Sequence, residues 1–405
     1  MGRHSWGVLV WAGAAVVRMA LVALPGHPVD VGAFHAWAVR LAEVGPRAFY
    51  APGVFVDYLP GYLLVLWPLG LLVRSFPFLA PEVLKLPPAV ADFAVAYWLR
   101  RLGGPRGGVA SVAYLWNPAV LLAGPWWGQA ESVAVAWLVG SAWAWQNGRP
   151  GWAGLLFALG VLTKPQYAAV GVVLLLGLTQ GWPGVRGVAA TAGSFLAAVV
   201  GCGLVFGLWP WDLVRLALGA AATYPYGSVN ALNLWYLLGL NWKPDTTVVL
   251  ALPTGVWGAV LALAAVAWAA ARVAGRGEVG LAALGAAAAS ASVFAFATRM
   301  HERYLFPAVP FVLLAWSWKG ARSWLWATAS GVLLCNLVYG FAYLANFPEY
   351  ATPLWKAVWA GFRWPLPQAV CVLSVGLAVA CLGLVGAAGQ RGAATLVPWG
   401  RLPKS

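Results

Sequence analysis

Long apolar runs separated by short polar connections dominate the pattern of residues along this chain. A helix needs about 20 mainly apolar residues to cross a bilayer, whereas the strands of a membrane barrel alternate apolar and polar residues. The pattern therefore predicts an all-α polytopic membrane protein, in one domain over residues 1–405. Twelve spans are expected, at residues 6–24, 83–99, 108–124, 131–146, 151–163, 166–180, 187–207, 247–271, 279–298, 304–318, 323–345 and 366–387.

The apolar run at residues 61–73 is short, since it follows Pro60 and ends at Arg74. As a span, it would put the three arginines within residues 100–106 outside the cell. As a re-entrant or surface helix, it leaves them inside, and basic residues concentrate on the cytoplasmic side of membrane proteins. We therefore predict a re-entrant or surface helix in a long first extracytoplasmic loop, residues 25–82. Two further long outer connections are predicted, at residues 208–246 and 346–365.

Composition agrees with a membrane protein, because 62% of the 405 residues are hydrophobic and only 9% are charged. The net charge of +14 is unevenly distributed. In this topology the inner face has 13 cations and one acid, and the outer face 11 cations and nine acids. The basicity is thus mainly an orientation signal, so nucleic acid is not an expected partner. We predict a plasma-membrane protein with both termini cytoplasmic, an uncleaved first helix and its chemistry on the outer face.

The densest polar segment between two apolar runs is residues 298–304, which contain Arg299, His301, Glu302, Arg303 and Tyr304. Ionisable residues at membrane depth are functional candidates, because lipid does not solvate them. Arginine binds phosphate oxygens bidentately, so a lipid phosphate is the expected ligand, with Glu302 as an internal counter-ion. On a helical turn the two arginines would share one face. The alternative is an anchor cluster at the outer interface.

Two acids, Asp30 and Asp57, lie in the first outer connection. A carboxylate at the membrane edge can act as general base on a substrate hydroxyl. Each could instead cap the helix that follows, since Asp favours the N-cap position.

A polar turn between two spans contains Trp126, Trp127, Gln129 and Glu131. The indoles suit stacking on a sugar, but tryptophan is also enriched at membrane interfaces, and anchoring is the favoured interpretation. Gln129 and Glu131 could bind a substrate or cap the next helix.

Four charged residues lie at or inside span ends: Lys85, Lys164, Arg18 and Asp92. Lysines at helix ends usually extend to the interface, although both could also contact an anionic ligand. An ion pair between Arg18 and Asp92 would satisfy both without any further function. The four cysteines lie in apolar runs without the spacing of a metal site.

In order, the motifs resemble those of the type C (GT-C) polytopic glycosyltransferases, most closely the bacterial group similar to the GPI-anchor mannosyltransferases of the PIG-V type. The resemblance covers about residues 1–320, and residues 321–405 add C-terminal helices. Its motifs are Asp30, Asp57-Tyr58-Leu59-Pro60, Lys85-Leu86-Pro87 with Asp92, Asn117-Pro118, Trp127 to Glu131, Thr163-Lys164-Pro165-Gln166, and His301-Glu302-Arg303-Tyr304.

This resemblance implies a GT-C-like bundle that transfers a hexose, mannose by analogy, from a polyprenyl-phosphate sugar to a hydroxyl of a lipid or glycan, with inversion. Catalytic roles fall to Asp30 and Asp57. The donor phosphate would be bound by Arg299, His301, Arg303, Lys164 and Lys85. Substrate binding would involve Gln129, Glu131, Trp127, Gln166 and Tyr304. A monophosphate donor does not demand a metal, so no cofactor is required, although divalent-metal use stays open. The alternative function is a transporter or flippase for a lipid or small solute, but inverted repeats, common in transporters, are absent from the sequence.

Overall fold

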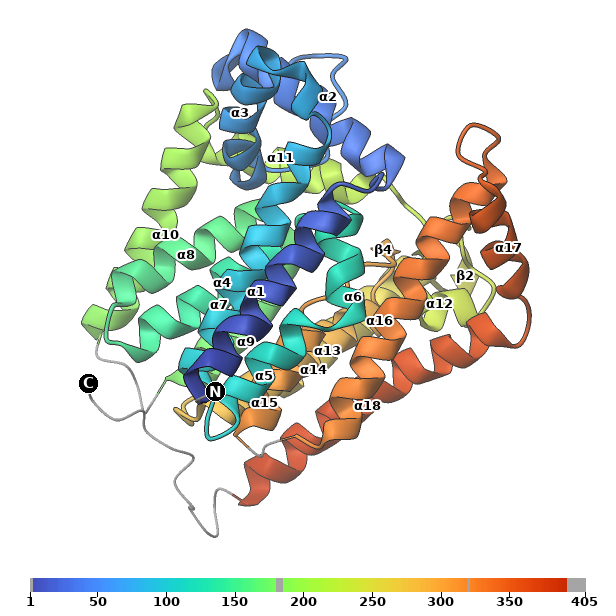
Figure 1. The fold of residues 1–405 in the computed structure, drawn as a ribbon. Coiled ribbons are helices and arrows are strands. Elements are labelled where there is room, and N and C mark those ends of the chain that lie inside the picture. Colours follow the sequence, from blue (N-terminus) through green and yellow to red (C-terminus); the bar gives the residue numbers. More distant parts are fainter. Residues whose placement is uncertain (1–2, 180–184, 319–320, 392–405) are drawn as a thin grey trace. The chain divides into compact units, whose positions relative to one another are not determined.

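The computed structural model describes residues 3–179, 185–318 and 321–391, and these residues are mostly helical (Figure 1). The chain divides into two compact units. Unit 1 comprises residues 1–98, 111–168 and 183–223. Unit 2 comprises residues 99–110, 169–182 and 224–405.

The helices of unit 1 come from the first half of the chain, and two of them, α4 and α5, continue into unit 2. They are α1 (Arg3–Val22), α2 (Pro28–Val44), α3 (Pro60–Ser75), α4 (Leu86–Leu102), α5 (Gly107–Leu115), α6 (Pro118–Leu121), α7 (Glu131–Gln146), α8 (Pro150–Thr163), α10 (Val185–Val205) and α11 (Pro210–Ala222). Short helical turns join them: η1 (Pro46–Ala48), η2 (Pro77–Leu79), η3 (Glu82–Lys85), η4 (Leu122–Trp126) and η5 (Pro165–Tyr167).

Unit 2 contains the remaining helices and two small two-stranded sheets. Its helices are α9 (Ala168–Leu178, whose first residue belongs to unit 1), α12 (Leu234–Leu237), α13 (Thr254–Val273), α14 (Val279–Phe296), α15 (Ala308–Ser317), α16 (Ser323–Tyr343), η6 (Leu344–Asn346), α17 (Pro353–Gly361) and α18 (Leu366–Arg391). Its strands are β1 (Ser228–Val229), β2 (Val248–Val249), β3 (Leu252–Pro253) and β4 (Met300–His301); β1 pairs with β4 in parallel, and β2 with β3 antiparallel.

Each of the twelve predicted spans overlaps at least one helix, although the run predicted at 247–271 begins with the strands β2 and β3. Among the described residues, five helices are long and apolar enough to cross a membrane: α10, α13, α14, α16 and α18. A sixth candidate is bent by 47° between residues 115 and 118. There the Asn117 side chain accepts a hydrogen bond from the Ala119 amide and Pro118 starts a new helix, which explains the break. Several apolar helices are shorter than a full span, including α3, α8 and α15.

Residues 25–82, the predicted first outer connection, contain the helices α2 and α3 and an extended segment between them. The helix predicted at residues 61–73 is present as α3, whereas α2 was not predicted from the sequence. The two helices pack side by side (Figure 1), and a Cβ at Gly70 would lie 1.9 Å from the Ala38 carbonyl oxygen, so only glycine permits this approach. The amphipathic helices α11 and α17, in the other two long connections predicted from the sequence, were also missed.

The Arg18–Asp92 ion pair, one of the possibilities that the sequence left open, is present inside unit 1. Arg18 Nε lies 2.9 Å from Asp92 Oδ2, and the two residues are 1% and 0% exposed. Asp92 Oδ1 also accepts hydrogen bonds from Tyr114 at 3.1 Å and Ser132 at 2.6 Å. The carboxylate therefore joins α1, α4, α5 and α7 through one buried polar cluster.

Candidate functional site

Asp30 lies in the first turn of α2, and its carboxylate contacts two rings. The Trp127 indole Nε1–H donates to Asp30 Oδ2 at 2.7 Å, and His27 Nδ1 lies 3.2 Å from the same oxygen. The N-cap of α2 is His27, so Asp30 does not occupy the capping position that was the alternative for it. Its side chain is 19% exposed, enough to meet a small reacting group.

Trp127 reaches Asp30 because the chain turns sharply beside it. The π-helical turn η4 ends at Trp126, and Gly128 follows with φ +94°, a conformation that L side chains rarely adopt. The His27 amide donates to the Trp127 carbonyl at 3.1 Å, and the two rings stack with centroids 4.5 Å apart and planes 7° from parallel. Trp127 is 1% exposed. The ring is therefore enclosed by protein, neither anchored at an interface nor open to a sugar.

Lys164 follows α8 and lies at the centre of a buried polar cluster. Its Nζ is 3.1 Å from Glu131 Oε1, 2.5 Å from the Tyr58 hydroxyl and 3.4 Å from Gln129 Oε1. Glu131 and Gln129 are fully buried and Lys164 is 3% exposed, so this lysine does not extend to the interface. Glu131 is the first residue of α7 and pairs with Lys164, whereas the N-cap of that helix is Ala130. The cluster holds one positive and one negative charge, together with donors and acceptors for a polar ligand.

Lys85 ends η3 and is also buried, which again contradicts the interfacial alternative. Its ammonium group donates to the Leu24 carbonyl oxygen.

Asp57 and Gln166, the other two candidates in unit 1, are half-buried. Asp57 lies in an extended segment two residues before Leu59, the N-cap of α3, so it too is outside the N-cap position. Its neighbour Tyr58 belongs to the Lys164 cluster, and Tyr50 donates to the Tyr58 carbonyl at 2.8 Å. Gln166 lies in η5, immediately after Lys164.

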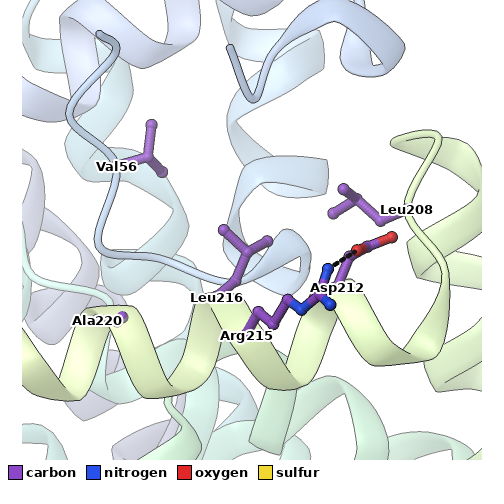
Figure 2. Close-up of a pocket in the computed structure, with 7 residues that line it drawn as sticks. Val56, Leu208, Asp212, Arg215, Leu216 and Ala220 are labelled. Carbon is purple, nitrogen blue, oxygen red and sulfur yellow. Dashed lines mark ion pairs between the residues drawn. The ribbon is translucent and has the colours of Figure 1, made fainter. Parts of the chain in front are cut away.

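A cavity of about 320 Å³ opens beside this extended segment (Figure 2). Val56 contributes to it from the segment, Leu208 from the connection before α11, and Leu216, Gly219 and Ala220 from α11 itself. The remaining lining residues are Asp212 and Arg215, which form an ion pair of 3.6 Å. The lining is thus largely apolar with one charged side, the chemistry that suits an amphipathic ligand.

Residues 298–304 form a bend, a strand and turns, so the expectation of a helical turn is wrong. Arg299 has φ 63°, its amide donates to the Tyr226 carbonyl at 2.9 Å, and β4 then pairs with β1. Arg299 Nε lies 2.7 Å from Asp245 Oδ2, and Arg303 lies 2.6 Å from Glu302 Oε1. Each arginine therefore has its own carboxylate partner, and Glu302 is a counter-ion as predicted.

Aromatic rings surround His301 in this part of unit 2. Tyr224 lies edge-on at 5.0 Å between centroids, and Tyr304 lies at 5.1 Å. The Arg303 guanidinium lies over the Tyr304 ring at 5.6 Å. The Arg299 side chain is 37% exposed, so part of its guanidinium can meet an anion. Among the described residues, no group of three or more His, Cys, Asp or Glu side chains could hold a metal ion.

The candidates thus fall into one group in each unit. Asp30, Asp57, Lys85, Trp127, Gln129, Glu131, Lys164 and Gln166 belong to unit 1; Arg299, His301, Arg303 and Tyr304 belong to unit 2. Sequence reasoning missed His27, Tyr58 and Asp245 as partners of these residues. Tyr58 lies inside a quoted motif and could have been found, whereas nothing local to Asp245 indicates Arg299.

In comparisons with known proteins, no protein-family model and no curated protein matches this chain. The chemistry of the two groups therefore carries the functional argument.

Proposed function

We propose that the protein is an extracytoplasmic type C glycosyltransferase of the plasma membrane. It transfers a hexose, mannose by analogy with the family it resembles, from a polyprenyl-phosphate donor to a hydroxyl of a lipid or glycan. The proposal includes twelve membrane spans, α3 as a re-entrant or surface helix, and cytoplasmic termini. The excess of cations in the predicted inner connections supports this orientation.

The observation that carries the proposal is the Asp30 carboxylate. It is partly accessible, lies in the first turn of a helix, and is held by an indole N–H. These features suit a general base, which must be ionised, oriented and within reach of a substrate proton. The helix N-terminus favours the ionised form of a carboxylate.

The reaction is a single displacement. The acceptor O–H proton moves to Asp30, a bond forms between the acceptor oxygen and the anomeric carbon, and the bond from that carbon to the phosphate oxygen breaks. The polyprenyl phosphate leaves as an anion, and attack from the opposite face inverts the anomeric configuration, as in inverting glycosidases. No metal is required for this charge balance.

Cations stabilise the departing phosphate. Electrostatic stabilisation of developing charge is usually the largest catalytic contribution, and the roles fall to Arg299, His301 and Arg303, with Lys164 and Lys85 assisting. The carboxylate partners of both arginines keep the guanidinium groups in place before the donor arrives. Gln166 and Tyr304, which are half-buried, supply hydrogen bonds to the sugars, while the fully buried Gln129 and Glu131 hold Lys164 in place.

The cavity in unit 1 supports a lipid-linked substrate (Figure 2). Its apolar wall would accommodate part of an isoprenoid chain, while Arg215 would face the polar end. Val56 in this wall immediately precedes Asp57, so a chain bound there would lie beside a segment that carries a candidate catalytic acid.

The test is transfer by the purified protein in lipid nanodiscs, with a panel of radiolabelled polyprenyl-phosphate hexoses and a membrane lipid extract. We expect one donor to yield a labelled product, Asp30→Asn to abolish transfer with donor binding retained, and Asp57→Asn to be milder. Glu43→Gln, an exposed acid near the other end of α2, is the matched control. If Asp30→Asn turns over at a near-normal rate and Asp57→Asn is inactive, Asp57 is the base and Asp30 has the lesser role. Uptake of intact donor into proteoliposomes without transfer would favour a transporter instead.

A further inference from the structure

We infer that Trp127 and His27 are positioning residues, which orient the Asp30 carboxylate without touching the substrate. The inference rests on the proposed role of Asp30 as the base. It also assigns Trp127 a function other than the interfacial anchoring that the sequence favoured and the substrate binding that the resemblance implies.

The need for positioning follows from the side chain itself. The last torsion of aspartate is broad, because it joins a tetrahedral to a planar carbon. Asp30 is also 19% exposed, so burial alone does not hold it. External contacts must therefore set the direction in which its oxygens point.

Both observed contacts converge on one oxygen, Oδ2. The indole N–H is a donor only, so at 2.7 Å it must donate to the carboxylate and cannot compete for the substrate proton. His27 Nδ1 lies 3.2 Å from the same oxygen. Two partners on Oδ2 fix the plane of the carboxylate and hence the direction of Oδ1.

Trp127 can act as an orienting group because its own position is fixed. The ring is 1% exposed and stacked on His27, and its carbonyl accepts the His27 amide proton. Gly128 lets the chain turn directly after it, and a Cβ at Gly128 would lie 3.0 Å from Lys85 Cγ. His27 is thus an ionisable group in contact with Asp30, and Lys85 lies against Gly128, next to Trp127.

A neighbouring residue offers a matched control. Trp126 also donates through its indole N–H, but to the Pro25 carbonyl at 3.1 Å rather than to a carboxylate. Trp127→Phe and Trp126→Phe therefore each remove one indole N–H, from adjacent positions, and only one of them touches Asp30. His27→Phe keeps a ring that can stack and removes Nδ1.

The experiment measures transfer as a function of donor concentration and pH for these three variants and Asp30→Asn. We expect Trp127→Phe to lower kcat about 10- to 100-fold, the cost of a misplaced reacting group, with donor KM within about twofold. Hydrogen bonds favour the ionised form of a carboxylate. Loss of the Trp127 hydrogen bond should therefore move the acid limb of the kcat/KM profile to higher pH by about one unit. His27→Phe should move the limb in the same direction, and Trp126→Phe should match the wild type.

A merely structural role for Trp127 would lower the yield of folded protein and leave the acid limb unmoved. If Trp127→Phe does not fold, His27→Phe supplies the same readout. If Asp30→Asn is inactive while Trp127→Phe and His27→Phe keep the wild-type limb and kcat, the positioning inference is wrong and the base assignment stands. If Asp30→Asn is itself active, the proposed role of Asp30 fails first.

Discussion

Replacing Asp92 by asparagine should strongly destabilise unit 1, because it leaves the Arg18 charge buried without a partner. Both residues are at most 1% exposed, and the carboxylate receives hydrogen bonds from Arg18, Tyr114 and Ser132. Breaking a buried ion pair by removing one partner costs about 3–5 kcal/mol. Asparagine retains one carbonyl oxygen that can accept from the two hydroxyl groups, so the cost comes mainly from the unpaired arginine. We expect the free energy of unfolding to fall by about 4 kcal/mol.

The pair is best isolated by a double-mutant cycle. Arg18→Met should cost less than Asp92→Asn, about 1.5–3 kcal/mol, since Asp92 keeps two hydroxyl donors. The double variant removes both charges and should be more stable than Asp92→Asn alone, with a coupling of about 2–3 kcal/mol. Asp212→Asn, in a more exposed pair at 3.6 Å, is the control and should cost less than about 1 kcal/mol.

The assay is equilibrium unfolding in mixed micelles as the fraction of denaturing detergent increases. Two results would refute the reasoning: a loss below about 1 kcal/mol for Asp92→Asn, or additive losses in the double variant. Either would mean that the Arg18 charge is solvated by something other than Asp92.

Two further predictions concern the other cations. Arg303→Lys keeps the charge but loses the planar guanidinium, so the KM for the donor should rise about tenfold, roughly the loss of one charge-assisted hydrogen bond. Arg303→Ala should raise this KM more. Kinetics with varied donor and fixed acceptor measure both values, and an unchanged donor KM in both variants would identify an anchor cluster. Lys85 is buried and donates to the Leu24 carbonyl oxygen, so Lys85→Met, which removes this donor, should lower the free energy of unfolding by about 1–3 kcal/mol. Equilibrium unfolding measures this loss, and a variant as stable as the wild type would contradict the assignment.

The sequence alone predicted the elements whose causes are local. An apolar run long enough to cross a bilayer must satisfy its backbone internally, and a helix does so from its own residues. For this reason each predicted span contains helical residues, although the one at 247–271 begins with β2 and β3. The Arg18–Asp92 pair was also predictable, because each residue lies in an apolar run and an unpaired charge there is costly. The amphipathic helices α2, α11 and α17 escaped, since their mixed composition resembles that of a polar connection.

The tertiary structure alone decided how the polar residues meet. Arg299 and Arg303 do not share a helical face, because the Arg299 amide bonds to Tyr226 and β4 pairs with β1, about 70 residues earlier in the chain. Lys164 is enclosed rather than interfacial, because Glu131 from α7 and Tyr58 from the first connection surround its ammonium group. Likewise, Asp30 and Trp127 are 97 residues apart in sequence. Hydrophobic periodicity reports which residues leave water, whereas the partner of a buried polar group depends on which distant backbones approach closely, and that is a property of the folded chain.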